Sequence, residues 1–291
     1  MRCDLHVHTI HSGMCTVPLL NRICRESYND PLEVYHLLKQ RGMHLVTVTD
    51  HDSIDAVEPL RHYPDFFLSE EVSCRTSRGT ELHVGVYGIT ERNHVELARR
   101  REDFPSFLAY CDEQRLLFSV NHVFSGLTGR RTDDDFEEFA LRFPAVETRN
   151  GAMLAQANHN AAEFAHATRK AVVAGSDSHT LAGLAKTYTE VPGARTAHEY
   201  LEGLRLGHAS VAGESGSYSK LTQAVWSIGL NMLEERPWTV VLAPLLAAVP
   251  LVTLVNLLME IAFAARWGGQ AARFGADRVR PAAYATHSPV P

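Results

Sequence analysis

Short strand-like runs that each carry a histidine or a carboxylate at or near their end constrain the fold of this chain more than any other feature. Residues 3–9 alternate apolar and polar side chains, so His6 and His8 share one face of a predicted strand. The later runs are 44–49 before Asp50, His51 and Asp52, 66–73 with Glu70 and Glu71, 81–87 with His83, 116–120 before His122, 144–147, and 171–175 before Asp177 and His179. Parallel α/β folds gather such strand ends on one rim. The pattern therefore predicts an α/β fold with a largely parallel sheet and a polynuclear metal site.

Helical segments separate these runs. Residues 31–41 are predicted to form a helix with a cap at Asn29-Asp30, Pro31 in its first turn and Gly42 as its stop. Further helices are predicted around residues 104–114, 158–168 and 199–206. The alternation of strand and helix is typical of a parallel sheet covered by helices.

The overall charge and the cysteines restrict the setting in which this chain works. A formal net charge of -6 argues against a protein that lives on duplex DNA, because neutralising phosphates needs a basic surface. Five cysteines without CxxC spacing indicate reduced thiols inside a cell. No secretory signal precedes the first motif, so a cytoplasmic location is expected.

Each motif alone has an ordinary explanation. An HxH pair is weak evidence for a metal, and Asp50-His51-Asp52 also suits a simple turn. Glu70-Glu71 also fits a solvated pair, and His83 fits a core histidine with a hydrogen-bond partner. The whole ordered set predicts a metal site, because its members come from different strand-like runs.

The ordered set resembles the PHP (polymerase and histidinol phosphatase) domain family over residues 1–215. The matching motifs are DLHVHT at 4–9, TDHD at 49–52, SEEVS at 69–73, LHVGVYG at 82–88, NH at 121–122, VETRN at 146–150 and GSDSH at 175–179. The stretch TYTEVPG at 187–193 resembles the extension of the family's stand-alone members.

The resemblance implies a distorted (β/α)7 barrel with up to three metal ions. One ion would be held by His6, His8, Glu71 and Asp177, a second by Glu71, His83 and His122, and a third by His51 and His179. The family usually has an Asp or His five or six positions after the HxH pair, where this chain has Gly13 and Met14. His11 and Cys15 are the nearby residues that could replace that ligand.

The implied activity is hydrolysis of phosphate monoesters, such as a nucleotide, sugar or amino-alcohol phosphate, by a metal-activated hydroxide. Glu71 would bridge two ions, and His51 or His179 would protonate the leaving oxygen. Arg130, Arg131 and Arg149 are candidates for binding phosphate, although a solvated surface is the more ordinary explanation for them. Imidazole-rich ligation favours Mn, Zn or Fe over Mg. The alternatives are a nuclease acting on nucleic acid ends and a non-catalytic metal-bound scaffold or regulatory module.

The last quarter of the chain differs in composition. We expect a phosphoesterase domain at 1–215 and a helical, apolar extension with a flexible tail at 216–291. No charged residue occurs from Trp238 to Met259, a length sufficient for a bilayer core, although Pro244 and Pro250 interrupt it. Residues 220–267 are therefore predicted either to associate with a membrane, to pack on the catalytic domain, or to form a homodimer interface.

Overall fold

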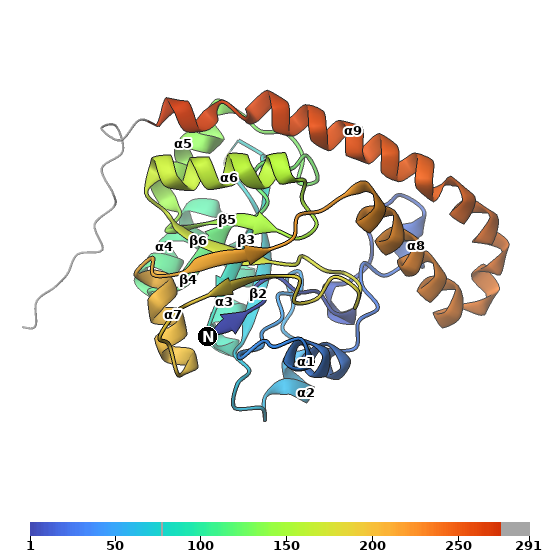
Figure 1. Cartoon of the computed structure of the whole chain (residues 1–291), viewed down its shortest axis with the longest axis horizontal. Helices are drawn as coiled ribbons and strands as arrows, with labels where there is room; N and C mark the ends of the chain where they lie inside the picture. The colour runs from blue at the N-terminus through green and yellow to red at the C-terminus, as the bar shows by residue number, and fades with distance from the viewer. Residues whose placement is uncertain (77, 275–291) are drawn as a thin grey trace, which may run out of the picture.

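The scaffold consists of two β-sheets surrounded by helices (Figure 1). The computed structural model describes residues 1–76 and 78–274. The five-stranded sheet has the order β2 (Ser69–Arg75), β3 (Glu81–Tyr87), β4 (Leu117–Val120), β5 (Ala145–Asn150) and β6 (Ala171–Gly175). The three-stranded sheet has the order β1 (Arg2–Cys3), β7 (Thr187–Glu190) and β8 (Ser210–Gly213).

Nine α-helices and four 3-10 helices complete the described residues. The α-helices are α1 (Pro31–Gln40), α2 (Val57–Leu60), α3 (Glu91–Arg100), α4 (Phe104–Glu113), α5 (Asp133–Arg142), α6 (Ala155–Thr168), α7 (Ala197–Arg205), α8 (Tyr218–Glu235) and α9 (Val249–Trp267). The 3-10 helices are η1 (Ile10–Ser12), η2 (Leu20–Arg22), η3 (Pro237–Ala248) and η4 (Gln270–Arg273).

The predicted α/β class is confirmed, whereas the predicted largely parallel pairing holds for only part of the sheet. Strands β4, β5 and β6 are parallel, but β3 runs antiparallel to both β2 and β4. The short connection between β2 and β3, residues 76–80, imposes this direction because a tight connection joins only antiparallel strands.

No closed sheet forms among the described residues, so the expected closed (β/α)7 barrel is not observed. Apart from β1, the runs at 3–9 and 44–49 pair with neighbouring segments only through isolated bridges. Val7 bridges to Ser178, and Val46 bridges to Phe66. A buried carboxylate replaces part of the ladder: Asp4 accepts hydrogen bonds from the backbone nitrogens of Ser176 and Ala185. Side-chain acceptors thus satisfy backbone groups that strand neighbours would otherwise pair.

The α1 segment folds as its sequence predicts. Asp30 caps the helix through Oδ1, which accepts from the backbone nitrogens of Leu32 and Glu33, and Pro31 occupies the first turn. Gly42, just beyond the helix, has a φ of 87°, which favours glycine. Helix α1 packs with α2 and the 44–49 run around a cluster that includes Val34, Leu38 and Val46.

A larger cluster of phenylalanines fixes the other side of the five-stranded sheet. Phe107 and Phe139 from α4 and α5, and Phe164 from α6, are fully buried with the inward residues of β3 and β4. The end of the C-terminal extension enters the same core through Ala264 and Trp267. The extension is therefore anchored in the main core rather than folding as a separate unit.

Between its two anchored ends, the extension projects from the body as a helical hairpin (Figure 1). Helix α8 leads outward, and η3 and α9 return along it, with the apolar run inside them. Pro237–Arg273 is long and apolar enough to cross a membrane, with a mean hydropathy of 2.3 in its most apolar window. Only 11% of that window is buried. The extension contacts the body at the end of α8, where Glu235 pairs with Arg25, and near the end of α9.

The structure describes the first residues of the tail that the sequence predicted to be flexible. The segment from Gly268 to Phe274 contains η4, where Gln270 donates to Asp133 at 2.8 Å and Arg273 pairs with the same carboxylate at 2.6 Å. The remainder of the predicted tail, residues 275–291, lies outside the described residues.

Gly175, at the end of β6, lies against the backbone of His6, one of the predicted metal ligands. A Cβ at this position would clash with the backbone nitrogen and the Cβ of His6. We expect Gly175→Ala to lower the free energy of unfolding by about 1–3 kcal/mol, as overpacking does, and to displace His6. Urea denaturation and metal content measure both effects. Gly269→Ala is the matched control because its Cβ meets no atom within 4 Å, and equal effects in both variants would contradict the prediction.

Candidate active site

The Glu71 carboxylate lies at the centre of a ring of imidazoles. Its Oε2 lies 3.3 Å from His6 Nε2, 3.7 Å from His8 Nε2, 3.1 Å from His51 Nδ1 and 3.5 Å from His83 Nδ1. Asp177 Oδ1 extends the cluster on one side, at 3.3 Å from His8, 3.5 Å from His6 and 3.8 Å from His179. On the other side, Glu71 Oε1 lies 3.2 Å from His122 Nε2. The structure thus brings together all eight side chains that the sequence predicted as metal ligands.

Several separate segments deliver these side chains. Glu71 lies within β2. His51 follows the 44–49 run and forms an isolated β-bridge with Glu71. His122 follows β4, and Asp177 follows β6, as the strand-end pattern predicts. His83 differs because it lies near the start of β3 rather than at its end. Since β3 runs antiparallel to its neighbours, its beginning lies at the same edge of the sheet as their carboxyl ends.

The cluster fits divalent metal ions by two observations. First, buried ring nitrogens of His6, His8, His51, His83 and His179, with Glu71 Oε2, have no hydrogen-bond partner among the described residues. Second, the separations of 3.1–3.8 Å around the two carboxylates mostly exceed hydrogen-bond lengths. They match the edge of about 3.4 Å between ligands that share a tetrahedral ion with bonds near 2.1 Å.

The ligand atoms fall into four overlapping groups that could each hold an ion. The groups are His6 with His8 and Asp177, His6 with Glu71 and His122, His51 with Glu71 and His83, and His8 with His51 and His179. Several side chains belong to more than one group, which is expected where neighbouring ions share ligands. His51 belongs to the group with Glu71 and His83 as well as to the group with His8 and His179, whereas the resemblance implied only a pairing with His179.

A second layer of side chains orients the ligands. Glu147 Oε1 lies 2.7 Å from His6 Nδ1, and both side chains are at least 98% buried, which leaves His6 Nε2 facing Glu71. Asn121 donates to Glu71 Oε1 at 2.8 Å. Asn150 donates to Glu147 and to the Oδ2 atom of Asp177, both at 2.9 Å. These hydrogen bonds fix which atom of each ligand faces the cluster.

The backbone is strained at two of the ligands. His122 has a φ of 30° and Asp177 a φ of 50°, values in the left-handed region where a side chain other than glycine costs free energy. Surrounding contacts hold this geometry: His122 N donates to Glu147, and Asp177 N donates to the carbonyl of His6. Such strain is typical of sites where function fixes the backbone.

The electrostatics keep Glu71 and His8 in the states that bind metals, whereas the nearby carboxylates, Glu71 foremost, raise the pKa of His6 and of His51 against the effect of burial. Burial opposes the charge of Glu71, yet the surrounding imidazoles, His6 and His83 foremost, hold its pKa well below its usual range. Burial lowers the pKa of His8 to about 3, and the neighbouring His179 acts in the same direction. Glu71 is therefore an anion and His8 a neutral base, the forms in which these side chains coordinate cations.

Glu26 is a site residue that the sequence did not reveal. Its Oε1 lies 3.5 Å from His179 Nε2 and its Oε2 lies 3.7 Å from His51 Nε2. Burial opposes its charge, but contacts with His179 and His51 hold its pKa well below the usual range. Neither His11 nor Cys15, the expected substitutes, belongs to a candidate metal group among the described residues.

Among the three candidate phosphate-binding arginines, Arg131 and Arg149 bond to groups outside the metal-ligand cluster in the described part of the chain. Arg131 is buried and donates to the Glu81 carbonyl at 2.9 Å and to Thr128. Arg149 donates to the Gly213 carbonyl at 2.9 Å, and the Arg130 side chain is exposed. No hydrogen bond or ion pair in residues 1–76 and 78–274 joins any of the three to the metal-ligand cluster.

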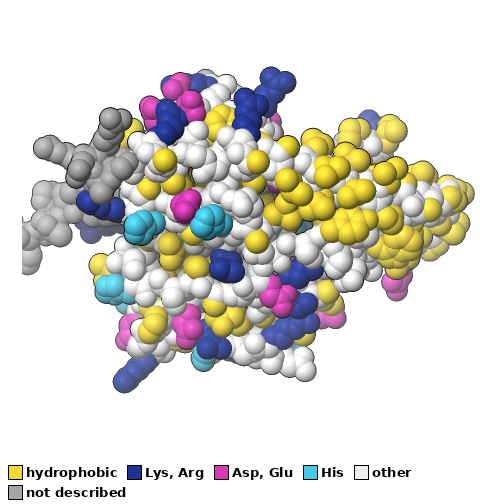
Figure 2. Space-filling model, turned by 45° about the horizontal axis from the view of Figure 1, so that its top comes forward, with side chains coloured by type: hydrophobic (Ala, Val, Ile, Leu, Met, Phe, Trp, Pro, Cys, Tyr) yellow, Lys and Arg dark blue, Asp and Glu magenta, His cyan; other side chains and the backbone are white. Residues whose placement is uncertain are grey.

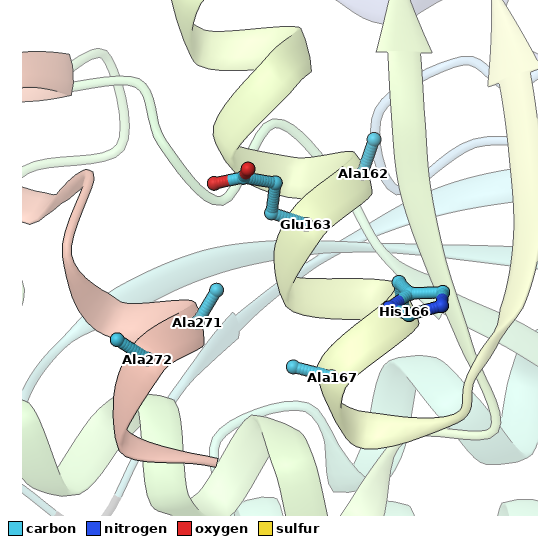
Figure 3. A pocket seen from close by; sticks show the side chains of 6 residues that line it. All are labelled: Ala162, Glu163, His166, Ala167, Ala271 and Ala272. Atoms are coloured by element: carbon cyan, nitrogen blue, oxygen red, sulfur yellow. The ribbon is translucent and has the colours of Figure 1, made fainter. Parts of the chain in front are cut away.

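A separate shallow hollow of about 560 Å³ lies between α6 and η4 (Figure 3). Alanines and the exposed side chains of Glu163 and His166 line it, and Figure 3 shows them around its open rim. None of its lining residues belongs to the metal-ligand groups. The hollow is therefore separate from the metal-ligand cluster around Glu71.

The cluster around Glu71 has the side chains of a polynuclear metal site on an α/β scaffold. Residues 155–208 match the PHP-associated family model, PHP_C. This match covers a minor part of the chain and agrees with the resemblance to the PHP family drawn from the sequence motifs. No curated protein sequence matches the chain significantly.

Several solved structures are similar to this chain at low sequence identity. PsfC from Pseudomonas syringae PB-5123 is 18% identical with a TM-score of 0.54, over 80% of this chain and 98% of PsfC. A candidate metal-dependent phosphoesterase from Bifidobacterium adolescentis is 12% identical with a TM-score of 0.46, over 70% and 96%. The lesion-specific endonuclease PfuEndoQ from Pyrococcus furiosus is 16% identical with a TM-score of 0.48, over 72% and 58%. These similarities concern the scaffold alone.

Glu147 provides a test of the orienting layer. Glu147→Gln keeps the shape but weakens the hold on His6 Nδ1, so we expect metal affinity to fall about 10- to 100-fold while the chain stays folded. Competition with a chelator measures the affinity, and circular dichroism checks the fold. Glu163→Gln, an exposed change on α6, serves as the control. Unchanged metal affinity in Glu147→Gln would show that this hydrogen bond does not orient a ligand.

Proposed function

We propose that this chain is a metal-dependent phosphoesterase that hydrolyses phosphate monoesters. The convergence of five imidazoles on the buried Glu71 carboxylate carries the proposal. Shared between the two central groups, Glu71 is suited to bridge neighbouring ions. We assign the ligand role to all eight predicted side chains, namely His6, His8, His51, Glu71, His83, His122, Asp177 and His179.

Divalent ions bound here would place positive charge beside the phosphoryl oxygens and lower the pKa of water toward neutrality. The residues of the chain provide the geometry for this chemistry. Glu147 holds the proton-bearing side of His6 away from the cluster, and Asn121 holds Glu71 Oε1. The ligand set is mostly imidazole, which favours Mn, Zn or Fe over Mg.

Proton transfer to the leaving oxygen was predicted for His51 or His179. Both rings face Glu26 and the cluster, so their contacts support a ligand role. Glu71 is likewise proposed as a metal ligand, so it would act through the ions it binds. In this proposal the leaving group takes its proton from solvent.

Small monoesters fit the chain better than nucleic acid. The net charge of -6 disfavours a polyanionic strand, and the three candidate arginines make no contact with the ligand cluster in the described part of the chain. A nuclease acting on strand ends is the second candidate, and a metal-bound scaffold without catalysis is the third. The presence of all eight predicted ligands in one cluster argues against a degenerate scaffold.

The catalytic proposal is tested with the purified full chain loaded with Mn²⁺. We expect release of phosphate from a chromogenic monoester and from mononucleotides, and a loss of at least about 10³-fold in kcat/KM for His8→Ala or Glu71→Ala. Removing a ligand forfeits several kcal/mol of transition-state stabilisation, which corresponds to such a factor. EDTA treatment should abolish the same activity.

His166→Ala is the matched control, because this exposed histidine lies in the separate hollow (Figure 3). Faster cleavage of a short oligonucleotide than of any mononucleotide would favour the nuclease instead. Metal binding without turnover of any phosphate ester would favour the scaffold.

We also propose that η3 and α9, within the helical hairpin, attach the protein to a lipid surface from the cytoplasm. Hydrophobic side chains cover the projecting end of the molecule (Figure 2). Val241 is 73% exposed on η3, and Leu251, Leu258 and Met259 are more than half exposed on α9. A helix that is apolar over most of its circumference suits a bilayer, which surrounds it, better than a single protein face.

The connectivity favours insertion into one leaflet over a complete crossing. The end of α8 pairs with Arg25 of the body through Glu235, and α9 buries Ala264 and Trp267 in the main core. Both ends of the apolar segment therefore lie on the same side. Trp226 and Trp238, 40% and 61% exposed, supply the amphipathic rings that favour a membrane interface.

Flotation with phosphatidylcholine vesicles tests this attachment. We expect the full chain to float with the vesicles, and the double variant Leu251→Asp/Leu258→Asp to lose at least about tenfold in binding, because charge is costly in the apolar layer. Leu206→Asp is the matched control, since Leu206 is 66% exposed on the body. A chain that stays with the soluble fraction, and that light scattering shows to be a dimer, would assign the hairpin to a second copy.

A further inference from the structure

The segment between η1 and α1 forms a small closed loop beside the cluster. Cys15 N donates to the Cys24 carbonyl at 3.0 Å, and Met14 pairs with Arg25 in an antiparallel bridge. Glu26 N then donates to the Gly13 carbonyl at 3.1 Å. Residues 13 and 26, far apart in the sequence, therefore lie directly opposite each other at the base of this loop.

Gly13 occupies the position where the family usually has a ligand. Its φ of 88° and ψ of -152° suit glycine and strain any other residue. A ligand side chain at residue 13 is thus disfavoured by the backbone of this loop. Directly across from it, Glu26 points its carboxylate at the two imidazoles that lack their expected partner.

The Glu26 carboxylate is shaped to complete a site with these imidazoles. One oxygen faces His179 and the other faces His51, at 3.5 and 3.7 Å, too far for direct hydrogen bonds and close to the edge between ligands of one ion. The buried Nε2 of His179 has no hydrogen-bond partner within residues 1–76 and 78–274. His8, His51 and His179 already form one of the four candidate metal groups.

The loop that bears Glu26 is held at several points. Arg25 donates through Nη1 to the Ile10 carbonyl at 3.4 Å and through Nε to Glu235 at the end of α8, at 2.7 Å. Next to it, Ser27 donates to the His8 carbonyl at 3.2 Å, which ties the segment to a ligand. Glu26 is therefore presented by a fixed backbone.

We propose that Glu26 is the carboxylate ligand of a third metal ion held with His51 and His179, and that it replaces the ligand missing at Gly13. This inference rests on the metal-dependent function proposed above and names a residue for its third site. The role predicts a specific loss: one ion of three, with the two ions at Glu71 retained.

Metal stoichiometry tests the assignment directly. The full chain is loaded with Mn²⁺, desalted, and its metal counted by mass spectrometry, with circular dichroism to check folding. We expect three equivalents in the unaltered chain and two in Glu26→Gln, which keeps the shape of the side chain but not its charge. Glu33→Gln, an exposed change on α1, is the matched control and should retain three.

A rescue variant separates a ligand from a simple ion-pair partner of the two histidines. Glu26→His supplies a different metal ligand but no negative charge, so the third equivalent should return. Loss of the third equivalent in Glu26→His as well as in Glu26→Gln would overturn the ligand role, as would three equivalents in Glu26→Gln or only two in the unaltered chain. The proposed function fails by a different result, namely no metal bound, or no effect of Glu71→Ala on metal content.

Discussion

A fully buried carboxylate, Glu71, determines the arrangement of the whole site. An isolated charge in this position would be costly, because burial removes it from water. The surrounding imidazoles and Asn121 offset that cost in the metal-free chain, and bound cations would do so more strongly. The strained backbone at His122 and Asp177, and the close approach of Gly175 to His6, are consequences of bringing so many side chains to one point.

Much of this site was predictable from the sequence, because strand ends are visible in a hydrophobic pattern. His6, His8, His122, Asp177 and their partners were found in this way. Glu147 ends the run predicted at 144–147 and carries the same signal, so the strand pattern could also have pointed to it. Glu26 was not, since it lies in an irregular loop with no period, and only the pairing of that loop with Gly13 places it beside the imidazoles.

The fold was predicted less completely than the site. The α/β class and helix α1 followed from periodicity and capping, which act locally. The antiparallel direction of β3 and the absence of a closed sheet depend on long-range pairing, which alternation alone does not encode. Similarly, composition identified the apolar run from Trp238 to Met259, but only the burial of Trp267 at its far end shows that the chain returns to the body.

The pairing of Gly13 with Glu26 has a consequence for how ligands are recognised in sequences. A pattern that requires an acidic residue at a fixed distance from the HxH pair scores this chain as lacking one. In the folded molecule, the same place is reached from thirteen positions further on, through one backbone hydrogen bond. Spatial neighbours of a glycine at an expected ligand position are therefore the natural place to look for a displaced one.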